Sequence, residues 1–308
     1  MFDVLLLSLT DSSGCAATRA PVLTCRDALV RGGARPELIT VGSDEEVDAV
    51  LARLDGPVRP DGLAWPDPDR KTRLVVATAT DGQLRAVVRR LVRRYAPPPL
   101  RRPDDLPAQR TMPDLPPLGV LPLDTGGLPT LLGLPGTPDE VAEAVLAGRT
   151  RRLDLLRTDG GSVTLNGALL GGADADGQAV TWRGRVEVDD SVLTDGTEPV
   201  LACVVANAAG YATVDGLPLT PAADPADGVL DVAVAVPVVT RSFRRGRRVS
   251  IEVRRTRGRA VSVNPLDGEL PLLEDSVFTT LSHKRFWWVE SGAWEVYALP
   301  AGHGGMRR

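Results

Sequence analysis

Apolar residues follow two different spacings along this chain, and the spacing changes near Arg152. Before that residue, short apolar runs predict four β-strands, at 4–9, 38–41, 74–77 and 119–121. Between these runs apolar residues recur every three or four positions, which predicts helices at 21–31, from Ser43 onward, at 83–95 and after Pro138. Strands that alternate with helices predict a three-layer α/β domain with a mainly parallel sheet, which we place at residues 1–152.

After Arg152 the helical spacing largely stops. Short alternating or apolar runs replace it, at 162–165, 179–183, 185–188, 200–206, 230–238, 248–254 and 260–263. Gly, Asp and Asn separate these runs, which is typical of antiparallel sheets. We therefore expect an all-β, sandwich-like domain at 153–298. Two closing strands, at 286–289 and 294–297, are able to return to the first domain, and a flexible tail is expected at 299–308.

The composition excludes several classes of protein. A hydrophobic share of 43% and a charged share of 25% are typical of a soluble globular protein, and a net charge of -4 gives no reason to expect a nucleic-acid partner. No apolar run approaches the ~20 residues that span a bilayer, and the N-terminal run lacks the basic region of a signal peptide. Three widely spaced cysteines fit neither a disulfide framework nor a zinc site, so we expect a reducing cytoplasm.

The best candidate for chemistry is the stretch 118–126, Leu-Gly-Val-Leu-Pro-Leu-Asp-Thr-Gly, where an apolar run ends in a glycine-bearing turn before a helix. Such a turn can present backbone N–H groups to an anion. Asp81 and Gly82 follow the third predicted strand in a second turn of this kind. Each turn also has a purely structural interpretation, because Asp81-Gly82 can be a capped strand-to-helix turn and Thr125 can cap the next helix.

Together these stretches resemble the catalytic domain of the diacylglycerol kinases, a family that includes bacterial lipid kinases and is related to the NAD kinases. The stretch 118–126 resembles the family's Leu-Gly-Ile-Ile-Pro-x-Gly-Thr-x-Asn-Asp turn, and 76–84 resembles its strand and Gly-Gly-Asp-Gly-Thr loop. In the second part of the chain, 206–207, 223–232 and 267–269 resemble the family's Gly-Asn, Asp-Asp-Gly-x-Leu-Asp-Val and Asp-Gly-Glu stretches. The matches keep the family's order over nearly the whole chain.

The resemblance implies an ATP- and Mg²⁺-dependent kinase that binds its nucleotide in a cleft between the two domains. It assigns nucleotide binding to Asp81, Gly82, Gln83, Thr125, Gly126 and Asn207. Glu269, in one turn with Asp267, would accept the proton of a lipid hydroxyl as that hydroxyl attacks the γ-phosphoryl group. The resemblance also implies a structural magnesium ion at Asp227, with oxygen ligands near Asp224 and Val229.

The chain departs from the family in the turns that would hold the phosphates. Ala79 and Thr80 stand where the family has two glycines, and Gln83 stands where it has a threonine. Glycine lets the backbone approach a ligand closely, which a Cβ obstructs. Asp124 replaces the glycine before Thr125, so it adds a negative charge beside a polyphosphate, and the Asn-Asp pair that follows in the family is missing.

Two functions therefore stay open. One is a diacylglycerol-kinase-like lipid kinase that acts on a lipid or lipid-like hydroxyl, and the other is a catalytically inactive pseudokinase of the same fold that binds a ligand or a partner. A NAD-kinase-like activity is third, because the Asp-Gly-Glu stretch favours the lipid kinases. Asp227-Gly228 and Asp267-Gly268 also read as ordinary hairpin turns, and Glu269 as a solvated strand residue.

The expected partners are a nucleotide and a hydroxyl-bearing substrate, and no nucleic acid. The arginines of 83–94 are expected to form a solvated face. At most they support peripheral contact with anionic lipids at the inner membrane face. A homodimer stays open.

Overall fold

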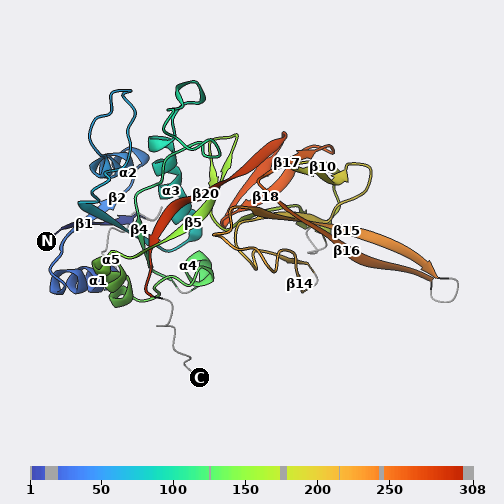
Figure 1. The fold of residues 1–308 in the computed structure, drawn as a ribbon. Helices are drawn as coiled ribbons and strands as arrows, with labels where there is room; N and C mark the ends of the chain where they lie inside the picture. The colour runs from blue at the N-terminus through green and yellow to red at the C-terminus, as the bar shows by residue number, and fades with distance from the viewer. Residues whose placement is uncertain are drawn as a thin grey trace. The chain divides into compact units, whose positions relative to one another are not determined.

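The computed structural model describes residues 2–10, 20–124, 126–173, 179–214, 216–242 and 246–300. Two compact units make up the chain (Figure 1). The first consists of Met1–Leu153 with Gly292–Arg308, and the second of Asp154–Ser291. The chain enters the second unit within β5 (Thr150–Thr158) and leaves it within β20 (Arg285–Tyr297). The domain limits expected at 152 and 298 stay predictions, and residues 301–308 of the expected tail lie outside the described residues.

A parallel sheet forms the centre of the first unit. It has the order β20-β4-β3-β1-β2 and every pair in it is parallel. Its strands, besides β20, are β1 (Asp3–Leu9), β2 (Arg35–Val41), β3 (Thr72–Thr78) and β4 (Leu118–Pro122). Val4, Leu5, Leu6 and Leu7 are all fully buried, as expected for a continuous apolar run in a sheet that is covered on both faces.

Helices cover both faces of this sheet. Figure 1 shows α1 (Ala20–Arg31) and α5 (Pro138–Ala147) on one face and α2 (Asp44–Leu51) and α3 (Asp81–Tyr95) on the other. Shorter helices are η1 (Ala52–Leu54), η2 (Pro99–Arg101) and α4 (Gly127–Leu131). Within the described part of the chain, no helix is both long and apolar enough to cross a membrane.

The described residues of the second unit form strands and no helix, as the change of spacing predicts. Its longer strands are β7 (Gly167–Leu170), β10 (Gly184–Val188), β11 (Ser191–Asp195), β12 (Ala202–Ala206), β15 (Leu230–Ser242), β16 (Gly246–Gly258), β17 (Ala260–Pro265), β18 (Leu270–Glu274) and β19 (Val277–Leu281). Its short strands are β6 (Val163–Thr164), β8 (Gly172–Ala173), β9 (Ala179–Val180), β13 (Thr213–Val214) and β14 (Leu217–Pro218).

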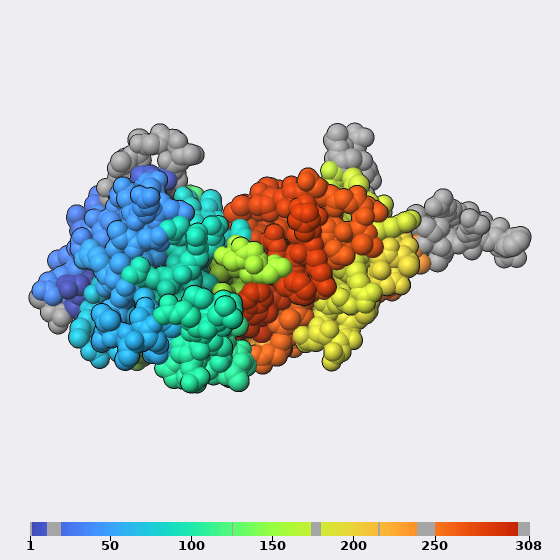
Figure 2. Space-filling view, turned by 90° about the horizontal axis from the view of Figure 1, so that it is seen from above, coloured from blue at the N-terminus to red at the C-terminus, as the bar shows by residue number. Residues whose placement is uncertain are grey.

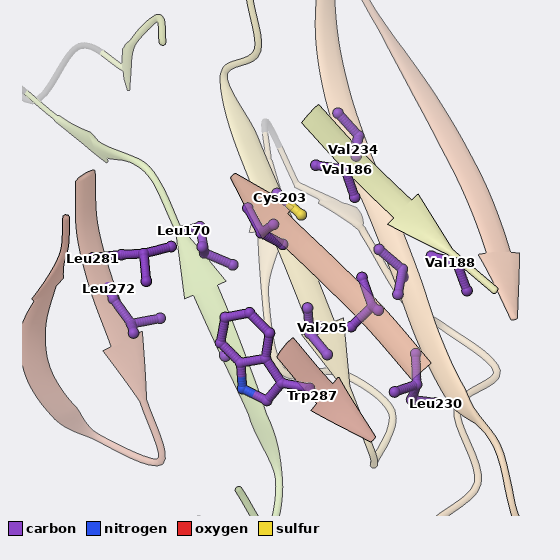
Figure 3. Packing of buried hydrophobic residues seen from close by; sticks show 14 of the residues in the cluster. Leu170, Val186, Val188, Cys203, Val205, Leu230, Val234, Leu272, Leu281 and Trp287 are labelled. Atoms are coloured by element: carbon purple, nitrogen blue, oxygen red, sulfur yellow. The ribbon is translucent and has the colours of Figure 1, made fainter. Parts of the chain in front are cut away.

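Two groups of antiparallel strands enclose the core of this unit. One is the six-stranded sheet β16-β15-β12-β7-β18-β19, and the other has the order β11-β10-β17-β20 and, through β20, belongs to a ten-stranded mixed sheet. Figure 3 shows Cys203 and Val205 of the first group gathered with Val186 and Trp287 of the second in one apolar cluster. Trp287 is fully buried, so the indole fills the space that would otherwise separate the sheets.

Two expectations from the sequence are wrong. The two closing strands are one continuous strand, β20, because Gly292 adopts a positive φ of 58° and lets the strand continue through a local distortion. The arginines of α3 are not all solvated, because Arg90 pairs with Asp44 and Asp48, and Arg94 pairs with Asp55.

A network of ion pairs holds the Pro-rich segment 96–117, which covers part of the face of the first unit shown in Figure 2 (green). Asp114 of this segment pairs with Arg110 at 3.0 Å and with Arg152. Arg152 and Arg70 also pair with Glu295 of β20, at 3.1 and 3.0 Å, and the Glu295 side chain is only 3% exposed. The segment is therefore fastened to the last strand by charge as well as by packing.

Candidate functional site

The turn between β3 and α3 is closed by its own side chains. Thr80 is the N-cap of α3, and its hydroxyl accepts a hydrogen bond from the Gln83 N–H at 3.2 Å. The Gln83 Oε1 in turn accepts one from the Ala79 N–H at 2.8 Å. The structural interpretation of Asp81-Gly82 as a capped strand-to-helix turn is therefore confirmed, with Thr80 as the cap. This reciprocal pattern satisfies N–H groups that a helix start otherwise offers to a ligand.

The turn between β4 and α4 is joined to the first turn by Asp81. Gly126 and Gly127 have φ values of 104° and 67°, which glycine adopts without strain. The Asp81 Oδ1 accepts a hydrogen bond from the Leu128 N–H at 2.8 Å, and a Cβ on Gly127 would lie 2.7 Å from the same oxygen. The glycine at 127 is thus required by the close approach of Asp81. Thr125 lies outside the described residues.

These contacts test whether the two turns fit the phosphates of ATP. A phosphate group needs hydrogen-bond donors and positive charge. Here the chain's own acceptors use the N–H groups of Ala79, Gln83 and Leu128, and Asp81 brings a negative charge to the start of α4. In this arrangement the turns do not fit a triphosphate. The cofactor-binding role of Asp81, Gly82, Gln83, Thr125 and Gly126 stays a prediction, and the geometry of the described residues argues against it.

Asp267 and Glu269 lie together in the second unit, in the turn between β17 and β18. Gly268 between them has a φ of 105°, so the turn depends on a glycine at this position. Both acidic residues are exposed and line a pocket of about 270 Å³. The other lining residues are Gly172, Ala173, Val180, Thr181, Trp182, Arg183, Pro265, Gly268, Leu270 and Pro271.

This pocket combines opposite charges with an apolar wall. The carboxylates of Asp267 and Glu269 can accept hydrogen bonds from hydroxyl groups, the Arg183 guanidinium can bind an anion, and Leu270 and Pro271 offer apolar surface. Such a mixture is typical of small-molecule sites. The structure brings the two predicted catalytic residues into one pocket, and their catalytic role stays a prediction.

Asn207 has a structural environment. It is 1% exposed at the end of β12, and its Nδ2 donates hydrogen bonds to the carbonyl oxygens of Asp154 and Leu165, both at 2.9 Å. Its backbone N–H donates to the Asn166 carbonyl at 2.8 Å. These bonds tie the residue that follows β12 to the middle of β5 and to the residue that follows β6. The nucleotide-binding role of Asn207 also stays a prediction.

The predicted metal ligands lie in a loop that the chain stabilises by itself. The Asp224 Oδ1 accepts from the Ala226 N–H at 3.0 Å, and the Asp227 Oδ1 accepts from the Val229 N–H at 3.1 Å. The other carboxylate oxygen of Asp227 pairs with a guanidinium, that of Arg257. Among the described residues, no group of three or more His, Cys, Asp or Glu side chains could hold a metal ion. The loop therefore does not fit magnesium, and the ligand set of Asp224, Asp227 and Val229 stays a prediction.

Sequence reasoning overlooked three residues that shape these sites: Asp154, Arg183 and Arg257. Asp154 is 1% exposed and its Oδ2 accepts a hydrogen bond from the Gly228 N–H at 2.6 Å. The signal for Asp154 was weak, a lone acidic residue inside an apolar run. The partners of Arg257 follow only from the register of β15 and β16, which the sequence does not give.

Comparisons with known proteins show the fold. No family model matches the sequence, and no curated protein sequence does. The crystal structure of a diacylglycerol kinase from Bacillus anthracis strain Sterne matches with a TM-score of 0.62 and 13% identity, over 96% of this chain and 97% of that chain. Two structures provisionally named as diacylglycerol kinases of the same strain match with TM-scores of 0.65 and 0.63, each at 14% identity. They cover 96% and 97% of this chain, and 97% and 98% of their own.

The chain therefore has a diacylglycerol-kinase-like fold, a mixed α/β architecture with a large mixed sheet and a separate antiparallel sheet. At 13–14% identity the similarity extends to the fold and carries no activity or substrate with it.

Proposed function

We propose that this protein is a catalytically inactive member of the diacylglycerol-kinase-like fold, which binds a hydroxyl-bearing ligand in the pocket beside Asp267 and Glu269 without phosphorylating it. The observation that carries the proposal is the hydrogen bond from the Leu128 N–H to the Asp81 carboxylate. It puts an anion of the chain itself at the start of α4, where a kinase of this fold would need donors for phosphate.

Phosphoryl transfer depends almost entirely on positioning and on electrostatic stabilisation of the transferred group. In this chain the first turn is capped by Thr80 and Gln83, the second turn holds the Asp81 carboxylate, and Asp124 adds an exposed negative charge nearby in sequence. A phosphate that binds here must displace intramolecular hydrogen bonds, and each one lost reduces the free energy of binding by about 1 kcal/mol. The negative charges of Asp81 and Asp124 would also repel a phosphate.

The pocket supports the binding half of the proposal. Two carboxylates that flank Gly268 can accept hydrogen bonds from two hydroxyl groups or from one hydroxyl and a water. Val180, Leu270 and Pro271 supply apolar surface for a hydrocarbon portion of the ligand. The names of the structural neighbours suggest a short-chain diacylglycerol as the first probe, since it carries one hydroxyl and two short apolar chains.

An active lipid kinase is the second candidate. The presence of Asp267 and Glu269 together at a pocket favours it, because a carboxylate beside a bound hydroxyl is placed to accept its proton. In that case the two turns of the first unit would have to exchange their internal bonds for phosphate contacts when ATP binds.

Calorimetric titration with ATP and MgCl₂ separates the two candidates. We expect no heat of binding at millimolar ATP and no transfer of label from γ-labelled ATP to dioctanoylglycerol. The quadruple variant Ala79→Gly, Thr80→Gly, Gln83→Thr, Asp124→Gly should gain measurable ATP affinity, because it frees backbone donors and removes a charge. Tight binding of ATP by the wild-type protein, with label transfer that Glu269→Gln abolishes, would establish the kinase instead.

Binding of the hydroxyl-bearing ligand needs its own measurement. Dioctanoylglycerol in detergent micelles should quench or shift the tryptophan fluorescence of the wild-type protein, because Trp182 lines the pocket. Glu269→Gln should weaken this binding, whereas Glu187→Gln should not, since Glu187 pairs with Arg185 and does not line the pocket. Equal binding by both variants would remove the pocket from the proposal.

A further inference from the structure

The register of the longest hairpin in the second unit places a cation opposite an anion. β15 and β16 pair along their full length, and Asp231 lies directly opposite Arg257. The Arg257 Nε lies 3.2 Å from the Asp231 Oδ2. Another nitrogen of the same guanidinium pairs with the Asp227 Oδ2. One planar cation therefore joins a residue of the strand to a residue of the loop before it.

Further polar groups of this loop help to hold its shape. Asp224 and Asp227 each accept a hydrogen bond from the N–H two residues later, and Gly228, at a φ of 77°, donates to the buried Asp154 at 2.6 Å. The Asp227 N–H lies 3.5 Å from the Asp224 carbonyl oxygen. Asp154 therefore holds one side of the segment 224–231, and Arg257 holds the other.

The loop needs a positive charge at this place. The side chains of Asp227 and Asp231 are 27% and 14% exposed, so both carboxylates are partly removed from water. Burial raises the pKa of Asp231, and the charge of Arg257 acts in the opposite direction. Two partly buried carboxylates near each other are unfavourable unless a cation neutralises them.

We infer that the Arg257 guanidinium takes the place of the structural divalent cation that the family resemblance implies for this loop, so that the second unit is held without metal. A magnesium ion at Asp227 would need the oxygen that already faces the guanidinium, and the two cations would repel each other. Removal of the guanidinium leaves two adjacent carboxylates, which are the ligands that Mg²⁺ and Ca²⁺ prefer. This inference is independent of the proposed function, since it concerns the stability of the second unit.

Thermal unfolding with and without divalent ions tests the inference. The wild-type protein should unfold at the same temperature in EDTA and in millimolar MgCl₂ or CaCl₂. Arg257→Ala should unfold at a temperature lower by about 2–4 °C or more in EDTA. Millimolar MgCl₂ or CaCl₂ should restore much of this loss, and KCl of the same ionic strength should not.

A matched control lies two residues away on the same strand. Arg255 donates to the carbonyl oxygens of Leu219 and Pro218, so Arg255→Ala removes an arginine without freeing a carboxylate. It should lower the unfolding temperature with no recovery in divalent ions. Arg257→Gln serves if Arg257→Ala does not fold, because it keeps the length and polarity of the side chain and removes only the charge.

Two results would overturn the inference. The first is stabilisation of the wild-type protein by Mg²⁺ or Ca²⁺ to the same degree as the Arg257 variant, since a cation site would then coexist with the guanidinium. The second is a folded Arg257 variant that responds to divalent ions no more than Arg255→Ala, since Arg257 would then be an ordinary surface ion pair.

Discussion

The turns of the first unit and the loop 224–231 of the second unit resemble ligand sites in sequence, and in both the chain occupies the site itself. In the first unit the occupant is an acceptor, because the Asp81 carboxylate and the Gln83 amide oxygen bind backbone N–H groups. In the second unit the occupant is a donor, because the Arg257 guanidinium binds two carboxylates. An anion of the chain stands where the resemblance expects phosphate, and a cation of the chain stands where it expects a metal ion.

The two regions differ in how firmly they are built. Asp81 is half-buried and makes one recorded bond to the next turn, whereas the loop at 224–231 is fastened to Asp154, which is 1% exposed. A bond to a buried carboxylate is worth more than a bond to a half-buried one, because water cannot reach the buried group when the bond breaks. We therefore expect Arg257, which stands in place of a metal ion, to be needed for the stability of the second unit. In the first unit, a few substitutions should be enough to free the turns for phosphate.

The largest effect is expected from Asp154→Ala. This change leaves the partly buried Gly228 N–H without its charged acceptor and should lower the free energy of unfolding by about 2–3 kcal/mol. Asp154→Asn keeps an acceptor oxygen and should cost less. Urea unfolding at neutral pH measures both. A loss for Asp154→Ala within the ~0.5 kcal/mol typical of surface substitutions would show that the anchor is unimportant.

A smaller effect is expected from Asp81→Ala. The Leu128 N–H loses an acceptor that is only half-buried, so water that reaches this carboxylate can take its place, and the cost should be about 1 kcal/mol. Thr80→Ala, which removes the N-cap of α3, should cost a similar ~1 kcal/mol. The same urea titrations give both values. A cost for Asp81→Ala equal to that of Asp154→Ala would remove the difference between the two regions.

The sequence predicts the elements of this fold better than the contacts at its candidate sites. The strands β1, β3 and β4 are read from their apolar runs, since a strand buried on both faces has no polar alternation to obscure it. One error in strand number arises at Gly292, where a glycine inside a strand and a glycine in a turn look alike in sequence. The predicted runs also leave out β7, β11, β18 and β19 of the second unit.

The contacts at the sites depend on residues far apart in the chain. Asp81 meets Leu128 across 47 positions, and Arg257 meets Asp227 across 30. At Ala79, Thr80 and Gln83 the local sequence differs from the pattern of the family that it resembles, and the effect of this difference on nucleotide binding stays a prediction. Local patterns could not show that these residues cap one another or that Arg257 faces two carboxylates, because strand register and turn geometry decide this.

The smallest effect, and the only one that depends on pH, is expected at Asp114, where guanidinium groups also hold a carboxylate, but on the surface of the first unit. Burial alone would raise the pKa of Asp114, but the hydrogen bond from Arg152 and the charge of Arg110 outweigh it, so the pKa lies below its usual value. A carboxyl group whose pKa is lowered by folding stabilises the protein above its unfolded pKa of about 3.9, and this stability disappears as the pH falls through the folded pKa.

Asp114→Asn should therefore be less stable than wild type at pH 7 and equally stable in strong acid. The Asp114 side chain is 37% exposed, so solvent screening keeps the difference small. Urea unfolding from neutral to acidic pH measures it against Asp69→Asn, whose partner Lys71 is 75% exposed and which should follow the wild-type curve. If the Asp114→Asn and wild-type curves stay parallel down to the lowest pH, the two arginines do not stabilise the charge of Asp114. Stabilisation of a carboxylate by arginine would then be limited to the loop of the second unit.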